Sequence, residues 1–188
     1  MPFAPVIFLN GTSSSGKTTL AKAFQKAWND PSLYASVDAF IFMLGAHTLA
    51  DDPVRRGILP RLLSAFHRSL PVLADCGLPV IIDHVLESKD WLAECAEALK
   101  ERQVYFVGVR CPLSILEERE KARGDRQIGF ARWQFERVHR YGAYDLEIDT
   151  ARTRPEQAAN ELIGWLRSGG TPTAFDRIRQ EASCVPGR

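Results

Sequence analysis

Short apolar runs without polar alternation recur along the chain, and segments of helical periodicity separate them. Unbroken runs of this kind are typical of strands that are buried on both faces of a parallel sheet. The predicted strands cover residues 5–10, 33–37, 80–83, 104–109 and 144–148.

The segments between these runs predict helices, because their apolar side chains recur at the spacing of one helix face. The predicted helices cover residues 17–28, 61–74, 88–100, 112–122, 131–140 and 156–167. Residues 39–60 are interrupted by glycines and prolines and predict no clear element. The alternation predicts an α/β fold, a five-stranded parallel sheet with helices on both faces. Ligands of such sheets bind beyond the carboxyl ends of the strands.

The length and charge of the chain limit the possible architectures and partners. With 188 residues, we expect one domain over residues 1–168 and a C-terminal tail or short helix at residues 169–188. The formal net charge of +1 gives no reason to expect a nucleic acid or a membrane as partner. No apolar stretch approaches the roughly 20 residues that a membrane span needs.

Cysteine usage indicates a reducing compartment. The four cysteines, Cys76, Cys95, Cys111 and Cys184, lack the close spacing of zinc ligands. The N-terminal residues show no basic segment followed by an apolar run and a cleavage site, so no secretion signal is predicted. We therefore expect free thiols and a cytoplasmic location.

A glycine- and serine-rich loop between the first strand and the first helix matches the pattern G-x-x-x-x-G-K-S/T. In such a loop, successive backbone N–H groups converge on phosphate oxygens, and the following helix adds its positive dipole end. Lys17 is expected to reach the β- and γ-phosphates and the Thr18 hydroxyl to ligate Mg²⁺. The predicted nucleotide-binding residues are Gly11, Thr12, Ser13, Ser14, Ser15, Gly16, Lys17, Thr18 and Thr19.

Other motifs favour a kinase over a switch protein. The chain has no Asn-Lys-x-Asp segment that would read guanine and no Asp-x-x-Gly segment of a switch loop. It has a basic segment broken by glycine, with Arg119, Arg123 and Arg126, which we interpret as a lid at about residues 119–130. Such a lid closes over ATP and neutralises the phosphoryl group in transfer. The alternative is a solvated charged loop.

Two acids lie at predicted strand ends. Asp38 directly follows the second predicted strand, where a carboxylate can accept the proton of an attacking hydroxyl. A helix N-cap explains this position equally well. Asp83 ends the third predicted strand and is a candidate for holding a magnesium-bound water, with a cap or turn residue as the alternative. His84 is a candidate for either substrate contact or packing.

The chain resembles the chloramphenicol phosphotransferases over roughly residues 6 to 165. The phosphate loop is generic, whereas the lid and the later blocks are specific to this family. The matching blocks are Leu9-Asn10-Gly11-Thr12-Ser13-Ser14-Ser15-Gly16-Lys17, Val37-Asp38, Ile81-Ile82-Asp83, Val107-Gly108-Val109-Arg110-Cys111, Glu118-Arg119-Glu120-Lys121-Ala122-Arg123-Gly124-Asp125-Arg126, Gly129, Gln134, Val138-His139 and Tyr144-Asp145-Leu146-Glu147-Ile148-Asp149-Thr150.

The resemblance implies roles for individual residues. Asp38 matches the family's general base, and Arg123 and Arg126 match its lid arginines at the nucleotide phosphates. Arg119 is implied to lie near the adenine or its phosphates, and the loop from Thr150 onward to border the adenine. Structural contacts between the lid helix and the core are the expected role of His139 and Tyr144.

The sequence departs from the family at His84, where a second acid is expected, and in residues 40–70, which should line the acceptor pocket. The resemblance therefore specifies the acceptor less well than the nucleotide.

We expect an ATP- and Mg²⁺-dependent phosphotransferase that acts on a hydroxyl of a small molecule, chloramphenicol or a similar compound. One alternative is a kinase for a nucleoside, a sugar, another metabolite or a nucleic-acid end. The other alternative is a non-catalytic nucleotide-binding module.

Overall fold

The computed structural model describes residues 4–124, 128–141 and 143–183. Arg126, predicted as a lid arginine, and Cys184 lie outside the described residues.

The five strands form one sheet in which every neighbouring pair is parallel, in the order β2-β3-β1-β4-β5. The strands are β1 (Val6–Asn10), β2 (Leu33–Ser36), β3 (Val80–His84), β4 (Val104–Arg110) and β5 (Leu146–Asp149). The predicted fold class is confirmed. Strand β1 is central, and the chain builds β2 and β3 on one side of it before it crosses to β4 and β5 on the other. The carboxyl end of β1 is therefore the place where such sheets bind ligands.

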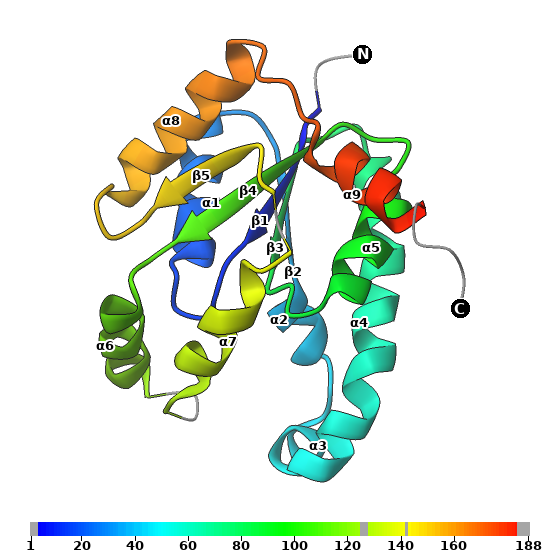
Figure 1. Cartoon of the computed structure of the whole chain (residues 1–188), viewed down its shortest axis with the longest axis vertical. Helices are drawn as coiled ribbons and strands as arrows, with labels where there is room; N and C mark the ends of the chain where they lie inside the picture. Colours follow the sequence, from blue (N-terminus) through cyan, green and yellow to red (C-terminus); the bar gives the residue numbers. More distant parts are fainter. Residues whose placement is uncertain (1–3, 125–127, 142, 184–188) are drawn as a thin grey trace.

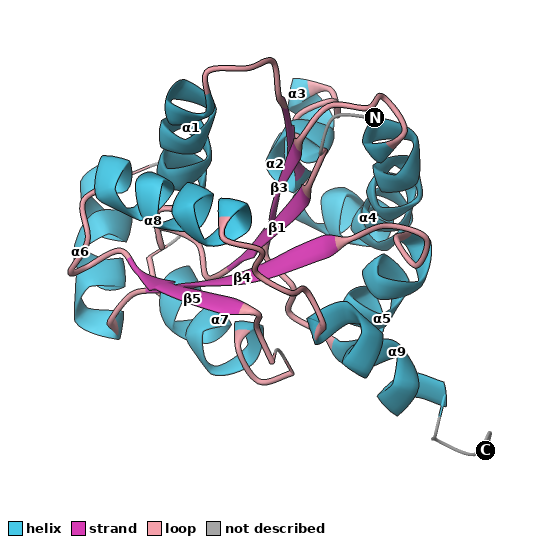
Figure 2. Cartoon of the chain, turned by 90° about the horizontal axis from the view of Figure 1, so that it is seen from above, coloured by secondary structure: helices cyan, strands magenta, loops and turns pink. Residues whose placement is uncertain are grey.

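Helices cover both faces of the sheet (Figures 1 and 2). The described helices are α1 (Lys17–Trp28), α2 (Val37–Ile41), α3 (Ala46–Ala50), α4 (Asp52–Ala74), α5 (Lys89–Ala98), α6 (Leu113–Arg123), α7 (Phe130–Val138), α8 (Pro155–Arg167) and α9 (Ala174–Ser183). Helices α1 and α8 pack on one face, and α4, α5 and α9 on the other (Figure 1). Helices α6 and α7 lie beyond the carboxyl ends of the strands, next to the expected binding edge (Figure 1).

Alternate residues of the central strand enter two separate cores. Ile7 and Leu9 belong to the cluster that contains Phe24 of α1 and the apolar side of α8. Phe8 belongs to the cluster with Phe66 of α4 and with α5 and α9. Each large side chain that is fully buried in this way contributes about 1.5–3 kcal/mol. These two layers fix the edge of the sheet at which the phosphate loop emerges.

The structure corrects the predicted second strand. It ends at Ser36, and Val37 begins helix α2, so Asp38 lies in the first turn of a helix instead of directly after a strand. The physical reason is packing, because Val37, at the start of α2, is buried in the core shared with α4. The N-cap residue is Ser36, so the interpretation of Asp38 as the N-cap is wrong.

Helix α4 begins at Asp52, well before the predicted start at residue 61. Its N-terminus is capped, because the Asp51 side chain accepts a hydrogen bond from the Val54 N–H at 3.1 Å. Pro60, which in the sequence suggests a break between helices, lies on an exposed part of α4. Proline has no N–H to donate to the carbonyl four residues earlier, and on this exposed part water can reach that carbonyl.

Residues after Gly170 contribute to the core. Phe175 and Ile178 of α9 pack into the cluster below α5 and the sheet. The Asp145 carboxylate accepts hydrogen bonds from the N–H groups of Thr173 and Ala174, at 2.8 and 2.9 Å, and so fixes the start of α9. Across the described residues, no helix combines the length and the apolar character that crossing a bilayer requires.

Candidate active site

A cleft of about 460 Å³ opens at the carboxyl ends of the strands. Its volume is within the range of small-molecule sites. The cleft brings together most of the predicted site residues, namely Ser13, Ser14, Gly16, Lys17, Thr18, Thr19, Asp38, Asp83, Arg119 and Arg123. Gly11, Thr12 and Ser15 are buried in the body of the same loop, whose backbone they shape.

The curvature of the phosphate loop depends on its glycines. Gly16 has φ +92°, a left-handed backbone that favours glycine. A side chain at Gly11 would have its Cβ only 2.5 Å from the Val109 carbonyl oxygen of β4. The loop therefore passes closer to β4 than any other residue type would allow.

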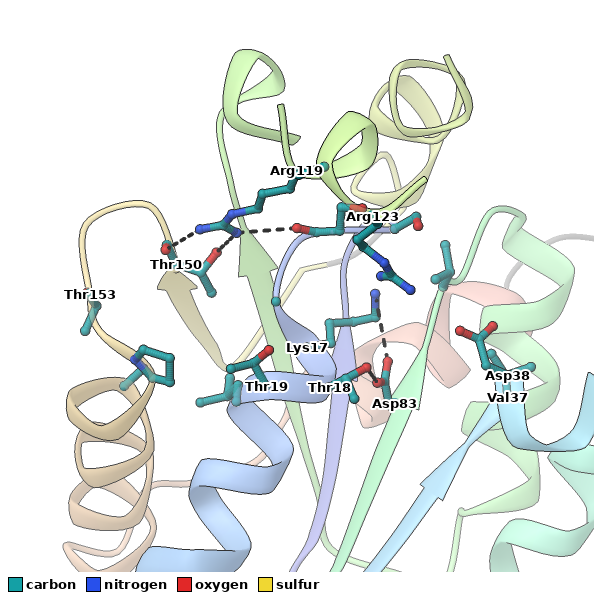
Figure 3. Close-up of a pocket in the computed structure, with 18 residues that line it drawn as sticks. Lys17, Thr18, Thr19, Val37, Asp38, Asp83, Arg119, Arg123, Thr150 and Thr153 are labelled. Atoms are coloured by element: carbon teal, nitrogen blue, oxygen red, sulfur yellow. Dashed lines mark hydrogen bonds and ion pairs between the residues drawn. The ribbon is translucent and has the colours of Figure 1, made fainter. Parts of the chain in front are cut away.

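The Lys17 side chain is held across the mouth of this loop. Its ammonium donates hydrogen bonds to the carbonyl oxygens of Gly11 and Thr12, both at 2.9 Å. It also lies 3.8 Å from Asp83 Oδ1 (Figure 3). Although only 6% of Lys17 is exposed, the charge is compensated by these oxygens and faces the cleft.

Asp83 at the end of β3 accepts two hydrogen bonds on Oδ2. The Thr18 hydroxyl donates at 2.8 Å, and the Tyr34 hydroxyl donates at 2.8 Å. Burial, followed by the charge of Asp83, raises the pKa of Tyr34 to about 12, so the phenol remains a neutral donor. A carboxylate beside a threonine hydroxyl is a set of hard oxygen ligands, and these residues therefore fit Mg²⁺ or its bound water.

Asp38 faces the same cleft from the opposite side, in the first turn of α2 (Figure 3). It is half-buried, and in Figure 3 it lies across the cleft from the cluster of Lys17, Thr18 and Asp83. A small molecule placed between Asp38 and the phosphate loop would touch both.

The two described arginines of α6 occupy different parts of the cleft. Arg119 donates hydrogen bonds to Thr150 Oγ1 at 3.2 Å, to the Thr150 carbonyl at 3.0 Å and to the Ser14 carbonyl at 3.4 Å. It thus joins α6 to the phosphate loop and to the loop after β5. The Arg123 guanidinium points toward Lys17 (Figure 3). Two cations therefore converge where phosphates are expected.

The carboxyl end of β1 carries a side-chain network that the sequence did not predict in detail. Asn10 donates to the Val138 carbonyl at 3.0 Å and to the Tyr144 hydroxyl at 2.9 Å, and accepts from the Leu86 N–H at 2.9 Å. The Tyr144 oxygen also lies 2.7 Å from His139 Nδ1. As expected, His139 and Tyr144 make structural contacts between α7 and the core.

The His139 ring is neutral in this network. Burial, with the nearby charges of Arg110 and Lys17, lowers the pKa of His139 to about 3. Since Asn10 donates to the Tyr144 oxygen, the Tyr144 proton is left for the unprotonated Nδ1 of His139.

His84 does not reach the cleft, and the idea that it contacts substrate is wrong. It is 1% exposed and stacks on Phe8 in the core. The packing interpretation is therefore confirmed. A carboxylate at this position would be buried among the rings of Phe8 and Phe66, which is a physical reason for the departure from the family pattern.

His67, His84 and Cys95 place one possible metal-ligand atom each within 4.8 Å of one another, all buried. However, the Val85 N–H donates to His84 Nδ1 at 2.7 Å, so the proton of the neutral ring is on Nε2. That Nε2 is 2.7 Å from His67 Nε2 and donates to it. His67 Nδ1 then donates to Glu94 at 2.8 Å. The ring nitrogens thus satisfy one another, and the cluster is a hydrogen-bonded chain rather than a metal site.

Several solved structures with a similar architecture are kinases. The fold is similar to adenosine phosphosulfate (APS) kinase CysC of Mycobacterium tuberculosis, with a TM-score of 0.66, 21% identity, and coverage of 89% of this chain and 99% of that chain. It is also similar to shikimate kinase of Acinetobacter baumannii, with a TM-score of 0.65, 16% identity, and coverage of 88% and 94%. At these identities the likeness shows the fold alone. Together with the phosphate loop, it defines a nucleotide-binding protein of the P-loop kinase class.

The sequence model of the chloramphenicol phosphotransferase-like protein family matches residues 4–167, and the chain belongs to that family. It is 30% identical to a provisionally named O-phosphotransferase of Mycobacterium tuberculosis, Rv2636 in strain H37Rv and MT2714 in strain CDC 1551. That alignment spans 202 residues and covers 96% of this chain and 90% of the relative. The protein is therefore a phosphotransferase of the kinase type.

Proposed function

We propose that this protein transfers the γ-phosphoryl group of ATP to a hydroxyl of a small molecule, with Mg²⁺. The observation that carries the proposal is that Asp38 faces the same cleft as the cluster of Lys17, Thr18 and Asp83. This arrangement supports a phosphate site on one side of the cleft and a proton acceptor on the other.

Lys17 and Arg123, together with Arg126, offset the charge on the phosphates as the phosphoryl group moves. Arg119 and Thr150 are proposed to border the nucleotide base at the far end of the cleft, because both line it and contact each other there. The backbone of residues 11–19 binds the phosphate oxygens.

Thr18 and Asp83 would hold Mg²⁺, Thr18 through its hydroxyl and Asp83 directly or through a water. When bound there, the ion would supply positive charge against the phosphates of the nucleotide. The Tyr34 hydroxyl keeps one lone pair of Asp83 Oδ2 occupied and so orients the carboxylate.

Asp38 is proposed as the general base. The acceptor oxygen forms a bond to the γ-phosphorus, the bond to the ADP oxygen breaks, and the hydroxyl proton goes to the Asp38 carboxylate.

Chloramphenicol or a similar compound is the acceptor that family membership supports first. Phe42 and Met43, 68% and 72% exposed in the turn after α2, follow Asp38 by four and five positions in the chain and offer apolar surface. A kinase for another hydroxylated metabolite, a sugar, a nucleoside or a nucleic-acid end remains the second proposal. A non-catalytic nucleotide-binding module is the third, and the joint presence of Lys17, Thr18 and Asp38 in one cleft argues against it.

The test is ATP-to-ADP turnover with Mg²⁺, with and without chloramphenicol, while the drug is followed by mass spectrometry. A phosphate added to the drug with high kcat/KM confirms reaction and acceptor. Unmodified drug with slow ATP hydrolysis contradicts this acceptor and directs the search to other hydroxylated compounds. An affinity for oligonucleotides that falls steeply as the salt concentration rises would instead favour a nucleic-acid end as the acceptor.

A further inference from the structure

Gln134 of α7 connects three segments that are far apart in the sequence. It is 2% exposed. Its Oε1 accepts a hydrogen bond from the Ser13 backbone N–H of the phosphate loop at 2.7 Å. Its Nε2 donates to Glu87 Oε1 at 2.6 Å, in the segment that follows β3.

The chemistry of the partners fixes the orientation of this amide. A backbone N–H such as that of Ser13 can only donate, and an ionised carboxylate such as Glu87 can only accept. Reversing the amide would place two donors against each other at Ser13 and two acceptors against each other at Glu87. Gln134 therefore satisfies both partners in one orientation.

One partner lines the cleft, and the other follows a segment that lines it. Ser13 lines the cleft itself, and so does Val85, two positions before Glu87. The Gln134 amide thus ties the phosphate loop and the segment after β3 to one helix. A shift of α7 would move two walls of the site relative to each other.

A second buried side chain extends this connection to α6. Glu120, 2% exposed, accepts hydrogen bonds from the N–H groups of Gly129 and Ala131 at 2.8 and 2.7 Å. It lies one turn before Arg123 and next to Arg119 on α6. Since Glu120 fixes α6 on the start of α7 and Gln134 fixes α7 on the phosphate loop, the two contacts together set where the α6 arginines lie.

We propose that Gln134 is a positioning residue for phosphotransfer, which holds α7 on the phosphate loop and thereby places Arg123 over Lys17. The inference rests on the proposed kinase function. This role can be told apart from a merely structural one, because it depends on a hydrogen-bond donor at position 134 and an acceptor at position 87. A double variant can exchange the donor and the acceptor between the two positions.

The test exchanges the pair. In Gln134→Glu, the new carboxylate still accepts from Ser13 but meets Glu87 with like charge. Burial raises the pKa of Glu87, so the assay is run at about pH 8.5 to keep a proton shared between the two carboxyl groups from restoring a donor. In the double variant Gln134→Glu with Glu87→Gln, the amide at position 87 donates to the carboxylate at position 134, and both contacts return. The single variant is expected to lose about tenfold or more in kcat, since small misplacements of catalytic groups have effects of this order. Its KM for ATP should change only a few-fold, because the loop backbone and Lys17 remain.

The double variant is expected to recover most of the lost kcat. Gln180→Glu, an exposed glutamine on α9, is the matched control for the added charge and should behave like the unmodified protein. If the single variant does not fold, the double variant alone is decisive. A single variant with normal kcat, or a double variant no better than the single one, would overturn the proposal.

A second readout does not depend on any acceptor. Hydrogen exchange of the Ser13 amide, measured by NMR without nucleotide, should be slow in the unmodified protein, fast in Gln134→Ala and slow again in the double variant. If the Ser13 amide exchanged as slowly in Gln134→Ala as in the unmodified protein, the hydrogen bond from the Ser13 N–H to Gln134 would be contradicted. Restored protection without phosphotransfer to any compound would instead contradict the proposed function and leave the connection standing.

Discussion

The Thr18 hydroxyl and the Asp83 carboxylate, from the helix after β1 and the end of β3, share a hydrogen bond of 2.8 Å at the centre of the cleft. The parallel pairing of β1 with β3 places Leu9 opposite Asp83 and so brings these two segments together. Because both side chains offer oxygen ligands, this contact is the element of the site most directly tied to Mg²⁺.

Asp83→Asn should raise the Mg²⁺ concentration needed for tight nucleotide binding by about tenfold or more. The amide removes the negative charge but keeps the size and an oxygen for Tyr34. The affinity for a fluorescent ADP analogue, titrated with Mg²⁺ and again with EDTA, measures the effect. Thr18→Ser, which retains the hydroxyl, is the control and should stay close to the unmodified protein. An unchanged Mg²⁺ dependence in Asp83→Asn would remove Asp83 from the metal site.

Acidification should destabilise the fold through His139. The pKa of His139 is about 3 in the folded protein, against 6.5 for an unperturbed histidine. Between these values the unfolded chain binds a proton that the folded protein does not, so the free energy of unfolding falls as the pH falls. The slope is about 1.4 kcal/mol per pH unit once the unfolded histidine is protonated.

Urea unfolding of the unmodified protein and of His139→Gln at pH 6 and pH 5 measures this contribution. The variant lacks the titrating group. Between pH 6 and pH 5, its free energy of unfolding should therefore fall by about 1 kcal/mol less than that of the unmodified protein. Parallel pH dependences of the two proteins would show that His139 titrates normally in the fold.

Gly108 of β4 has no room for a side chain. A Cβ there would lie 2.5 Å from the Tyr144 ring, which is packed against Phe106 and bonded to Asn10. Gly108→Ala should therefore destabilise the protein by about 1–3 kcal/mol, the usual effect of overpacking. Chemical unfolding is the measurement.

Gly164 is the matched control for the same chemical change. It lies in α8, and an added methyl group there would have no heavy atom of the described residues within 4 Å beyond its own turns of helix. Gly164→Ala should therefore stabilise the helix by about 0.5–1 kcal/mol. Opposite signs for the two substitutions support the packing argument. Equal effects would show that backbone freedom, and not Tyr144, decides the cost at Gly108.

The parallel sheet and the phosphate loop could be predicted because their signals are local. Buried strands such as Val80–His84 are continuous apolar runs, and the loop before Lys17 has a fixed spacing. Helix α5 likewise begins after Ser88, whose side chain accepts from the Trp91 N–H as the predicted cap does.

The start of α4 and the roles of Gln134 and Glu120 could not be predicted, because they depend on contacts over a distance. Pro60 suggests a break from its chemistry alone, whereas the structure places it on an exposed helix face. Gln134 and Ser13 are 121 positions apart, and no short motif indicates that a glutamine on a polar helix turns inward. His84 shows the opposite case, since a residue directly after Asp83 faces the other side of the sheet and therefore the core.

The central claim is that Asp38 takes the proton of the acceptor, and Asp38→Asn tests it most directly. Asp90→Asn is the control, because Asp90 is also an acid in the first turn of a helix but lies on α5, outside the cleft. The measurement is phosphorylated product formed per second at saturating ATP, alongside the affinity for ATP. A fall in turnover of about a hundredfold or more with ATP affinity nearly unchanged is the predicted result for Asp38→Asn alone. Retained turnover, or a collapse of ATP affinity, would contradict the account.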